Sequence, residues 1–217
     1  MEYLLIVLAY LVGAIPMSII VGKLTKGVDI RNYGSGNPGT TNAIRVLGRK
    51  LGLIVFLLDV LKGGFVILLI RVGLFELTEV FHPLLYGIAA AVGHIFPVFL
   101  KFKGGKAVAT SVGAFLFYSP LVGVIGLLMY LLGLKLTRYV SVGSCTGAAS
   151  VLILSYIVYF FGPSSESGWV FLFGQGDDLF MPILATIGVS LIFYRHRKNF
   201  VNIKNGTEPK SNFMQRK

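Results

Sequence analysis

The chain contains, at residues 51–70, the stretch LGLIVFLLDVLKGGFVILLI, in which only Asp59 and Lys62 are charged. Twenty mostly apolar residues are the length that an α-helix needs to cross the hydrocarbon core of a bilayer. The whole chain has this character: 55% of its 217 residues are hydrophobic and 13% are charged. In an ordinary soluble domain about a quarter of the residues are charged. The composition therefore predicts a membrane protein and not a soluble domain with a large core.

Seven apolar segments follow one another along the chain. Backbone groups in lipid must be paired internally, and the alternation of a β-barrel is absent, so the segments predict an all-α integral membrane protein, a seven-span helical bundle. Ser119-Pro120 separates the short fourth and fifth segments, which favours two compact helices over one helix with a central proline. Five spans plus a re-entrant pair is the alternative. The segments are residues 3–22, 51–70, 84–100, 107–118, 120–135, 142–161 and 180–194.

The distribution of charge predicts the orientation of this bundle. With the N-terminus outside, 18 of the 20 Lys and Arg residues fall on inner loops and the tail; Arg71 is outside and Lys62 is within a span. Basic residues concentrate on the cytoplasmic side of membrane proteins, so we expect an odd number of spans and a cytoplasmic C-terminus. We expect one transmembrane domain over residues 1–204 and a polar, loosely ordered cytoplasmic tail over 205–217. Six of the nine acids fall outside: Glu2, Glu76, Glu79, Glu166, Asp177 and Asp178.

The net charge of +11 does not predict a nucleic-acid partner. The basic residues lie in loops between apolar segments, where topology and anionic substrates or lipids explain them better. The one cysteine, Cys145, excludes an internal disulfide and is interpreted as a structural thiol. The three histidines, at 82, 94 and 196, lack the spacing of metal ligands. We therefore expect no metal and no cofactor.

The most polar stretch is GSGNPGTTNAIR at residues 34–45. Glycines allow successive N–H groups to point into one concavity that suits an anion, and hydroxyls, amides and Arg45 add donors for a phosphate. We expect the polar side chains to cap a helix that runs into Arg45, whose positive N-terminal end favours an anion. The alternative is an ordinary glycine-rich turn. The capping candidates are Ser35, Thr40, Thr41 and Asn42.

Three further polar clusters lie on predicted inner loops or helix ends. Residues 102–106, FKGGK, place two lysines around two glycines before Thr110, and the spacing is not that of a P-loop. Residues 138–144, RYVSVGS, open the sixth apolar segment, and RHRKN at 195–199 follows the last. The alternatives are positive-inside anchoring for the first, a serine N-cap with a basic anchor for the second and a stop-transfer anchor for the third.

Asp59, Lys62 and His94 lie inside apolar segments. Charges in lipid are costly and normally pair, so we expect Asp59 and Lys62 to form an ion pair that supports the site and does not contact a substrate directly. His94, near Pro97, is interpreted as a structural histidine and not a catalytic one. His82 is on the outer side and is interpreted as incidental.

Together these clusters resemble the motifs of the bacterial acylphosphate-dependent glycerol-3-phosphate acyltransferases, the PlsY family. The matches run in order over about residues 5 to 208, and the first two are long and specific. The matching stretches are residues 34–42 with Arg45, residues 93–97 leading to 102–110, Arg138-Tyr139 with Ser141 and Ser144, Arg195-His196-Arg197 with Asn199, and the pair Asp59 and Lys62 followed by Gly63.

The resemblance implies a seven-span enzyme of the bacterial inner membrane with its active site facing the cytoplasm. It implies transfer of a fatty acyl group from acyl phosphate to the 1-hydroxyl of glycerol 3-phosphate, the first acylation of phospholipid synthesis. Lysophosphatidic acid and phosphate would be the products, and acyl-CoA and acyl carrier protein would not be direct donors. The implied partners are acyl phosphate, glycerol 3-phosphate and membrane lipids.

On this interpretation several cytosolic loops converge on one pocket for two phosphorylated molecules. Loop 34–42 would hold the acyl phosphate head, with the acyl tail in a groove between spans. The only inner acids are Asp29 and Glu208, so a phosphate oxygen of the substrate is the expected base. The predicted catalytic residues are Lys106, Ser141 and His196. The predicted substrate-binding residues are Ser35, Gly36, Asn37, Gly39, Thr40, Thr41, Asn42, Arg45, Lys103, Gly104, Gly105, Ser144 and Asn199.

Two other classes of function remain open from the residues. A transporter or channel for a phosphate-bearing small molecule would also use a basic inner pocket, but transporters often have two related halves, and no strong repeat is visible. A lipid-binding scaffold would account for the basic loops but not for the glycines.

Overall fold

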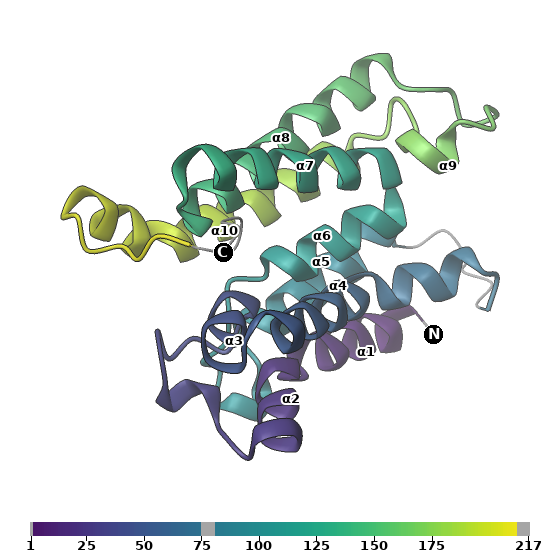
Figure 1. Cartoon of the computed structure of the whole chain (residues 1–217). Helices are drawn as coiled ribbons and strands as arrows, with labels where there is room; N and C mark the ends of the chain where they lie inside the picture. Colours follow the sequence, from purple (N-terminus) through teal and green to yellow (C-terminus); the bar gives the residue numbers. More distant parts are fainter. Residues whose placement is uncertain (1, 75–80, 212–217) are drawn as a thin grey trace. The chain divides into compact units, whose positions relative to one another are not determined.

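A computed structural model describes residues 2–74 and 81–211 of the chain (Figure 1). Every regular element within these ranges is helical, which confirms the predicted all-helical class. Glu76, Glu79, Arg216 and Lys217, used above to predict orientation, lie outside the described residues. The elements are α1 (Glu2–Ala14), α2 (Met17–Lys26), η1 (Ile30–Asn32), α3 (Thr40–Leu47), α4 (Arg49–Arg71), α5 (Pro83–Ile95), η2 (Val98–Leu100), α6 (Val108–Tyr118), α7 (Pro120–Thr137), α8 (Val140–Phe161), α9 (Val170–Phe173) and α10 (Phe180–Lys204).

Each predicted apolar segment falls on these helices, but not every one is a candidate span by length and composition. Within the described residues, α4, α7, α8 and the stretch Pro83–Leu100 are long and apolar enough to cross a membrane. α1 and α2 together give a fifth candidate, bent by 41°. α6 is a shorter apolar helix of 11 residues, and α10 becomes strongly basic after Tyr194. Seven spans therefore stay a prediction.

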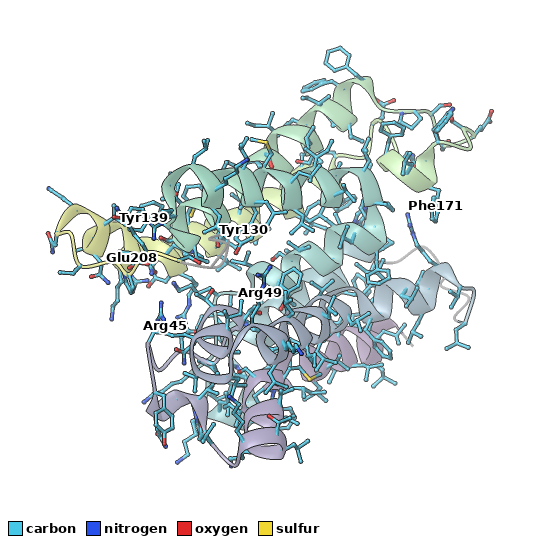
Figure 2. All side chains as sticks on the ribbon, viewed as in Figure 1. Arg45, Arg49, Tyr130, Tyr139, Phe171 and Glu208 are labelled. Carbon is cyan, nitrogen blue, oxygen red and sulfur yellow. The ribbon has the colours of Figure 1, made fainter. Side chains whose placement is uncertain are left out.

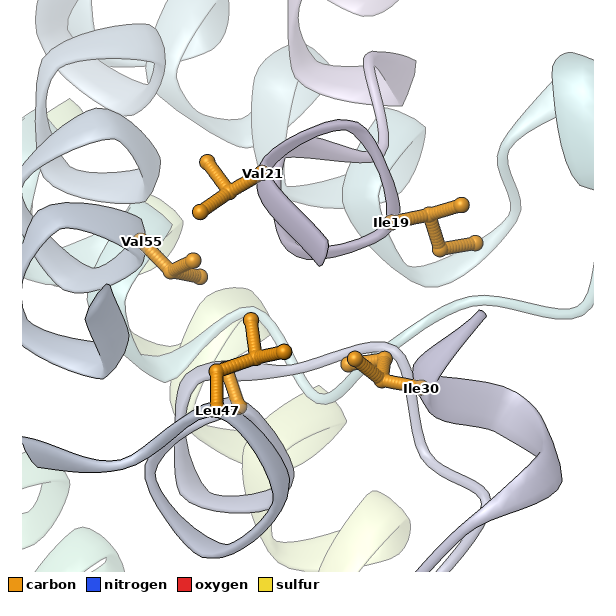
Figure 3. Packing of buried hydrophobic residues seen from close by; sticks show 6 residues of the cluster. Ile19, Val21, Ile30, Leu47 and Val55 are labelled. Atoms are coloured by element: carbon orange, nitrogen blue, oxygen red, sulfur yellow. The ribbon is translucent and has the colours of Figure 1, made fainter. Parts of the chain in front are cut away.

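The chain forms two compact units, Met1–Phe117 and Tyr118–Lys217. In the first unit α1 lies beside α5, and α4 packs against both. α4 and α6 approach so closely that a Cβ added at Gly63 would overlap the carbonyl oxygen of Thr110. Below them a separate apolar cluster joins α2, η1, α3 and the start of α4 (Figure 3). It contains Ile19, Val21, Ile30, Ala43, Leu47 and Val55. This cluster fixes both ends of the polar loop at residues 34–39.

In the second unit α7 and α8 form an antiparallel hairpin, and α10 packs along α8 (Figure 1). Arg138 turns the chain between α7 and α8 in the left-handed conformation, with φ 65°. Tyr118 donates to Asp178 at 2.6 Å and the Ser119 hydroxyl donates to the Phe173 carbonyl at 2.7 Å, so loop 162–179 folds back onto the start of α7. The start of the predicted tail is also folded back, because Ser211 N donates to the Arg138 carbonyl at 2.8 Å.

Replacing Gly63 by alanine tests the close approach of α4 and α6. The new methyl group has no room beside the Thr110 backbone, so the helices must separate, at a cost of about 1–3 kcal/mol. We expect a clearly lower Tm for purified Gly63→Ala in detergent. Gly168→Ala is the control, because nothing lies within 4 Å of a Cβ at Gly168. Equal Tm values for the two variants would show that the helices are not in contact at Gly63.

Candidate functional site

The loop at residues 34–39 is organised from inside by the side chain of Asn42. The Asn42 amide nitrogen donates to the carbonyls of Ile30 at 2.9 Å and Tyr33 at 3.1 Å, and its oxygen accepts from the Ser35 N–H at 2.9 Å. Asn42 is only 1% exposed. All of its main hydrogen-bonding directions are therefore used by the loop backbone, and its role in this structure is to set the shape of the loop.

Gly34 and Ser18 complete this arrangement. Gly34 has a φ of +60°, and a Cβ there would overlap the Asn42 amide oxygen, so the position needs glycine both for its backbone conformation and for space. The Ser18 hydroxyl, buried on α2, donates to the Pro38 carbonyl at 2.9 Å. Ser18 therefore ties the far end of the loop to the first unit. It lies in an apolar segment, so no pattern in the sequence distinguishes it.

The expected capping of α3 is wrong in detail. α3 does begin at Thr40, but its N-cap is Gly39, and no side chain caps it. Asn42 sits in the first turn with its amide directed back to Ile30 and Tyr33, since the loop folds over the start of the helix. Arg45 lies exposed in the last turn of α3 (Figure 2).

The second predicted cluster is held against the end of α5. Gly104 N donates to the Ile95 carbonyl at 3.1 Å and Gly105 N donates to the His94 carbonyl at 3.0 Å. A Cβ on Gly105 would overlap His94 Nε2. The two glycines thus bring the backbone of this stretch close to His94. Lys103, exposed, and Lys106, half-buried, lie on either side.

The predicted ion pair between Asp59 and Lys62 is confirmed. Lys62 Nζ lies 2.8 Å from Asp59 Oδ1, and both side chains are 2% exposed. Lys62 also donates at 2.9 Å to the carbonyl of Ile15, at the break between α1 and α2. His94 Nδ1 lies 3.8 Å from the same Asp59 oxygen. The pair thus links the helix break to the histidine on which Gly105 packs.

The second unit carries Ser141, Ser144, His196 and Asn199. The Ser144 hydroxyl donates to the Val140 carbonyl at 2.9 Å, whereas the Ser141 hydroxyl, buried, has no hydrogen-bond partner among the described residues. His196 Nδ1 lies 2.8 Å from the Ile192 carbonyl. Because a carbonyl only accepts, Nδ1 carries the proton in this contact.

Sequence reasoning missed that Glu208 belongs with these residues. Asn199 donates to the Glu208 carboxylate at 2.6 Å, and Asn202 lies 3.4 Å from its other oxygen. Glu208 and Tyr139 lie at the same end of the second unit (Figure 2), and Lys210 stands 5.8 Å from the centre of the Tyr139 ring. The Glu208 carboxylate is therefore engaged in holding the tail against α10. No pattern in the sequence pairs a residue of a polar tail with Asn199.

The other inner acid, Asp29, is also engaged. The Arg31 side chain donates to the Asp29 carboxylate at 2.6 Å, and this hydrogen bond holds the pKa of Asp29 below its ordinary value. A carboxylate with a lowered pKa is a weaker base.

The predicted site residues differ in exposure and divide between the two units. Within the described residues, no group of three or more His, Cys, Asp or Glu side chains is arranged to hold a metal ion. Ser35, Thr41, Arg45 and Lys103 are exposed; Gly36, Asn37, Gly39, Thr40, Lys106 and Asn199 are half-buried; Asn42, Gly104, Gly105, Ser141, Ser144 and His196 are buried.

The sequence model of the family described as glycerol-3-phosphate acyltransferase matches residues 3–206 of the chain. The chain belongs to the glycerol-3-phosphate acyltransferase family. A family member from Geobacillus kaustophilus is 45% identical over 210 residues, covering 97% of this chain and 96% of its own. The Bacillus subtilis member is 44% identical over 207 residues, covering 95% and 96%.

Solved structures of a family member agree. The crystal structure of PlsY, an integral membrane glycerol 3-phosphate acyltransferase, in its glycerol 3-phosphate form has a TM-score of 0.80 and 35% identity, covering 96% of this chain and 94% of that one. Its lysophosphatidic acid form also has a TM-score of 0.80, with 34% identity and coverage of 98% and 96%. The predicted PlsY family and the integral membrane fold class are confirmed, and so is the prediction of an acyltransferase.

Asn42→Ala tests whether this side chain organises the loop. The change leaves one N–H and two carbonyls of the loop without their partner, at a cost of about 1–3 kcal/mol for each buried group that water does not reach. We expect a lower Tm and faster hydrogen exchange at the Ser35 amide. Asn37→Ala, in the same loop, is the control. If both variants exchange and unfold alike, Asn42 does not hold the loop.

Asp59→Ala tests the buried ion pair. The single change leaves the Lys62 ammonium buried without its carboxylate, and such losses cost about 3–5 kcal/mol. Replacing both residues, as Asp59→Leu with Lys62→Met, leaves no unpaired buried charge and loses only the hydrogen bond from Lys62 to the Ile15 carbonyl, so we expect a smaller loss than in Asp59→Ala. Thermal unfolding in detergent compares the two variants. An equal loss of Tm in both would mean that the charge pairing itself is unimportant.

Proposed function

We propose that the chain transfers a fatty acyl group from acyl phosphate to the 1-hydroxyl of glycerol 3-phosphate. The products are lysophosphatidic acid and inorganic phosphate, and the reaction is the first acylation of phospholipid synthesis. The observation that carries the proposal is the family match over residues 3–206. It is supported by a relative of the same fold that was solved in a glycerol 3-phosphate form and a lysophosphatidic acid form.

The contacts of two acids, Asp29 and Glu208, support acyl phosphate as the donor. Asp29 is bound by Arg31, and Glu208 is bound by Asn199. Neither is arranged as the partner of a general-base histidine. A mixed anhydride reduces the need for such a base, because phosphate is a good leaving group. Orientation and charge stabilisation then supply much of the rate.

In this mechanism the 1-hydroxyl oxygen of glycerol 3-phosphate attacks the acyl carbonyl carbon. The bond between that carbon and the phosphate oxygen breaks, and the hydroxyl proton passes to a phosphate oxygen, so no external base or oxidant is needed. Lys103 and Lys106 neutralise the charge that develops. His196, whose ring is oriented by the contact of Nδ1 with the Ile192 carbonyl, lies toward the glycerol hydroxyls in this scheme, and the Ser141 hydroxyl offers a donor.

The remaining predicted residues bind the substrates. Residues 34–42 hold the head of acyl phosphate, in a loop whose shape depends on Asn42 and Gly34. In this scheme Asn42, Gly104 and Gly105 act by shaping the backbone, since their polar groups are used inside the fold. The residues proposed to clamp glycerol 3-phosphate are Arg45, Lys106, Ser141, His196 and Asn199.

We also propose the topology that the charges favour: seven spans in the bacterial inner membrane, with the N-terminus outside, a cytoplasmic C-terminus and a site facing the cytoplasm. Residues 1–204 form the transmembrane acyltransferase domain. Exposed basic residues in α2, in α3 and in the stretch 101–106 support this orientation.

Lys106→Met and Arg45→Ala test the proposal directly. Each removes a positive charge proposed to meet a phosphate, and we expect transfer from labelled acyl phosphate to glycerol 3-phosphate to fall by about a hundredfold or more. The purified protein in detergent is assayed for labelled lysophosphatidic acid. Lys26→Ala is the matched control, because Lys26 is an exposed basic residue at the end of α2.

Three results would contradict the proposal in different ways. Full activity in both folded variants would refute the site assignment. No transfer by the unaltered protein with acyl phosphate, but transfer with an acyl thioester, would refute the donor. Flux of phosphate compounds through vesicles without any transfer would favour a transporter instead.

A further inference from the structure

The loop between α8 and α10, residues 162–179, carries the only tryptophan of the chain, Trp169. The Trp169 side chain is 64% exposed and directly precedes α9, a short helix in which no residue is buried. Large exposed apolar side chains also stand where the loop begins and ends: Phe161 closes α8, and Leu179 precedes α10. The loop therefore presents apolar and aromatic surface that the second unit leaves uncovered.

Hydrogen bonds to the neighbouring helices fix this loop on the second unit. The Ser119 hydroxyl, buried at the start of α7, donates to the Phe173 carbonyl at 2.7 Å. The Asp177 N–H donates to the Tyr159 carbonyl at 3.0 Å, which ties the end of the loop back to α8. Trp169 is thus held at a defined place by contacts on both sides, and its exposure follows from the fold.

The backbone around Trp169 is suited to an apolar surrounding. The Trp169 carbonyl accepts from the N–H groups of Leu172 at 2.9 Å and Phe173 at 3.1 Å, and the Gly174 N–H donates to the Val170 carbonyl at 2.9 Å. Backbone polar groups can leave water only when they have such partners. α9 can therefore rest against lipid without leaving these groups unpaired.

The loop lies at the end of the second unit away from the candidate residues of α10 (Figure 1). The stretch of α10 from Phe180 to His196 is about 24 Å long at about 1.5 Å per residue. This length is most of the roughly 30 Å hydrocarbon core of a bilayer. The loop therefore stands near one membrane interface when His196 stands near the other.

The charges of the loop exclude attraction by anionic lipid. Residues 162–179 contain Glu166, Asp177 and Asp178 but neither Lys nor Arg. Clusters of basic residues are what draws a protein surface to anionic headgroups. A tryptophan ring favours the interface for another reason, because its apolar body enters lipid while its N–H stays near water.

We propose that Trp169 and α9 dock on the lipid interface opposite the candidate site and hold the start of α10 at that level. The partner is the electrically neutral lipid surface itself. Lipid already reaches the loop, because α8 is apolar enough to span a membrane and Phe161 at its end is 84% exposed. Surface elements of this kind lie about 5–10 Å deep in the boundary between headgroups and acyl chains.

The fluorescence of the unaltered protein tests this directly, because Trp169 is the only tryptophan. The protein is placed in phosphatidylcholine vesicles that carry bromine either near the top or near the end of the acyl chains. We expect emission at short wavelength, stronger quenching by the shallow bromine than by the deep one, and weak quenching by acrylamide in water. Adding phosphatidylglycerol leaves these values unchanged, since the loop has no basic residue.

Two matched variants in a Trp169→Phe background calibrate the depth. Ile153→Trp places the ring at a 60% exposed position of α8, about 12 Å along the helix from Phe161. We expect the deep bromine to quench this variant most. Ser164→Trp places the ring at an exposed polar position of the same loop. We expect acrylamide to quench it strongly and neither brominated lipid to do so.

Three results for Trp169 would overturn the proposal. Quenching like that of Ser164→Trp would place the ring in water, and quenching like that of Ile153→Trp would place it inside the hydrocarbon core. Emission at short wavelength without quenching by either bromine would mean that protein, such as a second copy of the chain, covers the ring. The readout is fluorescence, so it is decided separately from whether the protein transfers an acyl group.

Discussion

The buried ammonium of Lys62 holds the first unit together at its weakest point. A chain that crosses lipid cannot leave a backbone carbonyl unpaired, yet Pro16 lacks an N–H and interrupts the helix between α1 and α2. Lys62 donates to the Ile15 carbonyl, which also accepts from the Met17 N–H at 3.0 Å, and Asp59 balances the charge. The bend that follows redirects α2, whose Ser18 anchors the polar loop. An ion pair deep in an apolar helix has an unfavourable free energy by itself. Here it stabilises the bend between α1 and α2, and a straight helix would not place Ser18 beside the polar loop.

The polar loops use much of their own hydrogen-bonding capacity before any substrate arrives. Asn42 satisfies the backbone of loop 34–39, and the N–H groups of Gly104 and Gly105 donate to the end of α5. A loop fixed in this way does not have to be ordered by its ligand, so less of the interaction energy is lost on binding. In the proposed scheme phosphate meets mainly side chains at the loop borders, such as Arg45, Lys103 and Lys106. The glycine-rich backbone and the basic side chains thus have separate tasks in that scheme.

The sequence allowed good prediction wherever one strong physical rule acted alone. The lengths of the apolar segments predicted the helices. The high free energy of a charge in lipid predicted the ion pair of Asp59 and Lys62, which lie three residues apart on one helix. Prediction failed where the partner is distant in sequence. Asn42 was expected to cap α3, but its side-chain oxygen accepts from the Ser35 N–H, and its amide nitrogen donates to the Ile30 and Tyr33 carbonyls. Glu208 meets Asn199 only because the chain turns back after α10, and nothing local encodes that return.

The engagement of both inner acids bears on the chemistry. An enzyme that must remove a proton from a hydroxyl usually sets a histidine against a carboxylate. Here the Nδ1 side of His196 faces the Ile192 carbonyl of its own helix, and Asp29 and Glu208 have other partners. A backbone carbonyl can fix the tautomer of the ring but cannot stabilise the imidazolium as a carboxylate does. The proposed donor, acyl phosphate, is compatible with this arrangement, because it is already activated and carries its own proton acceptor.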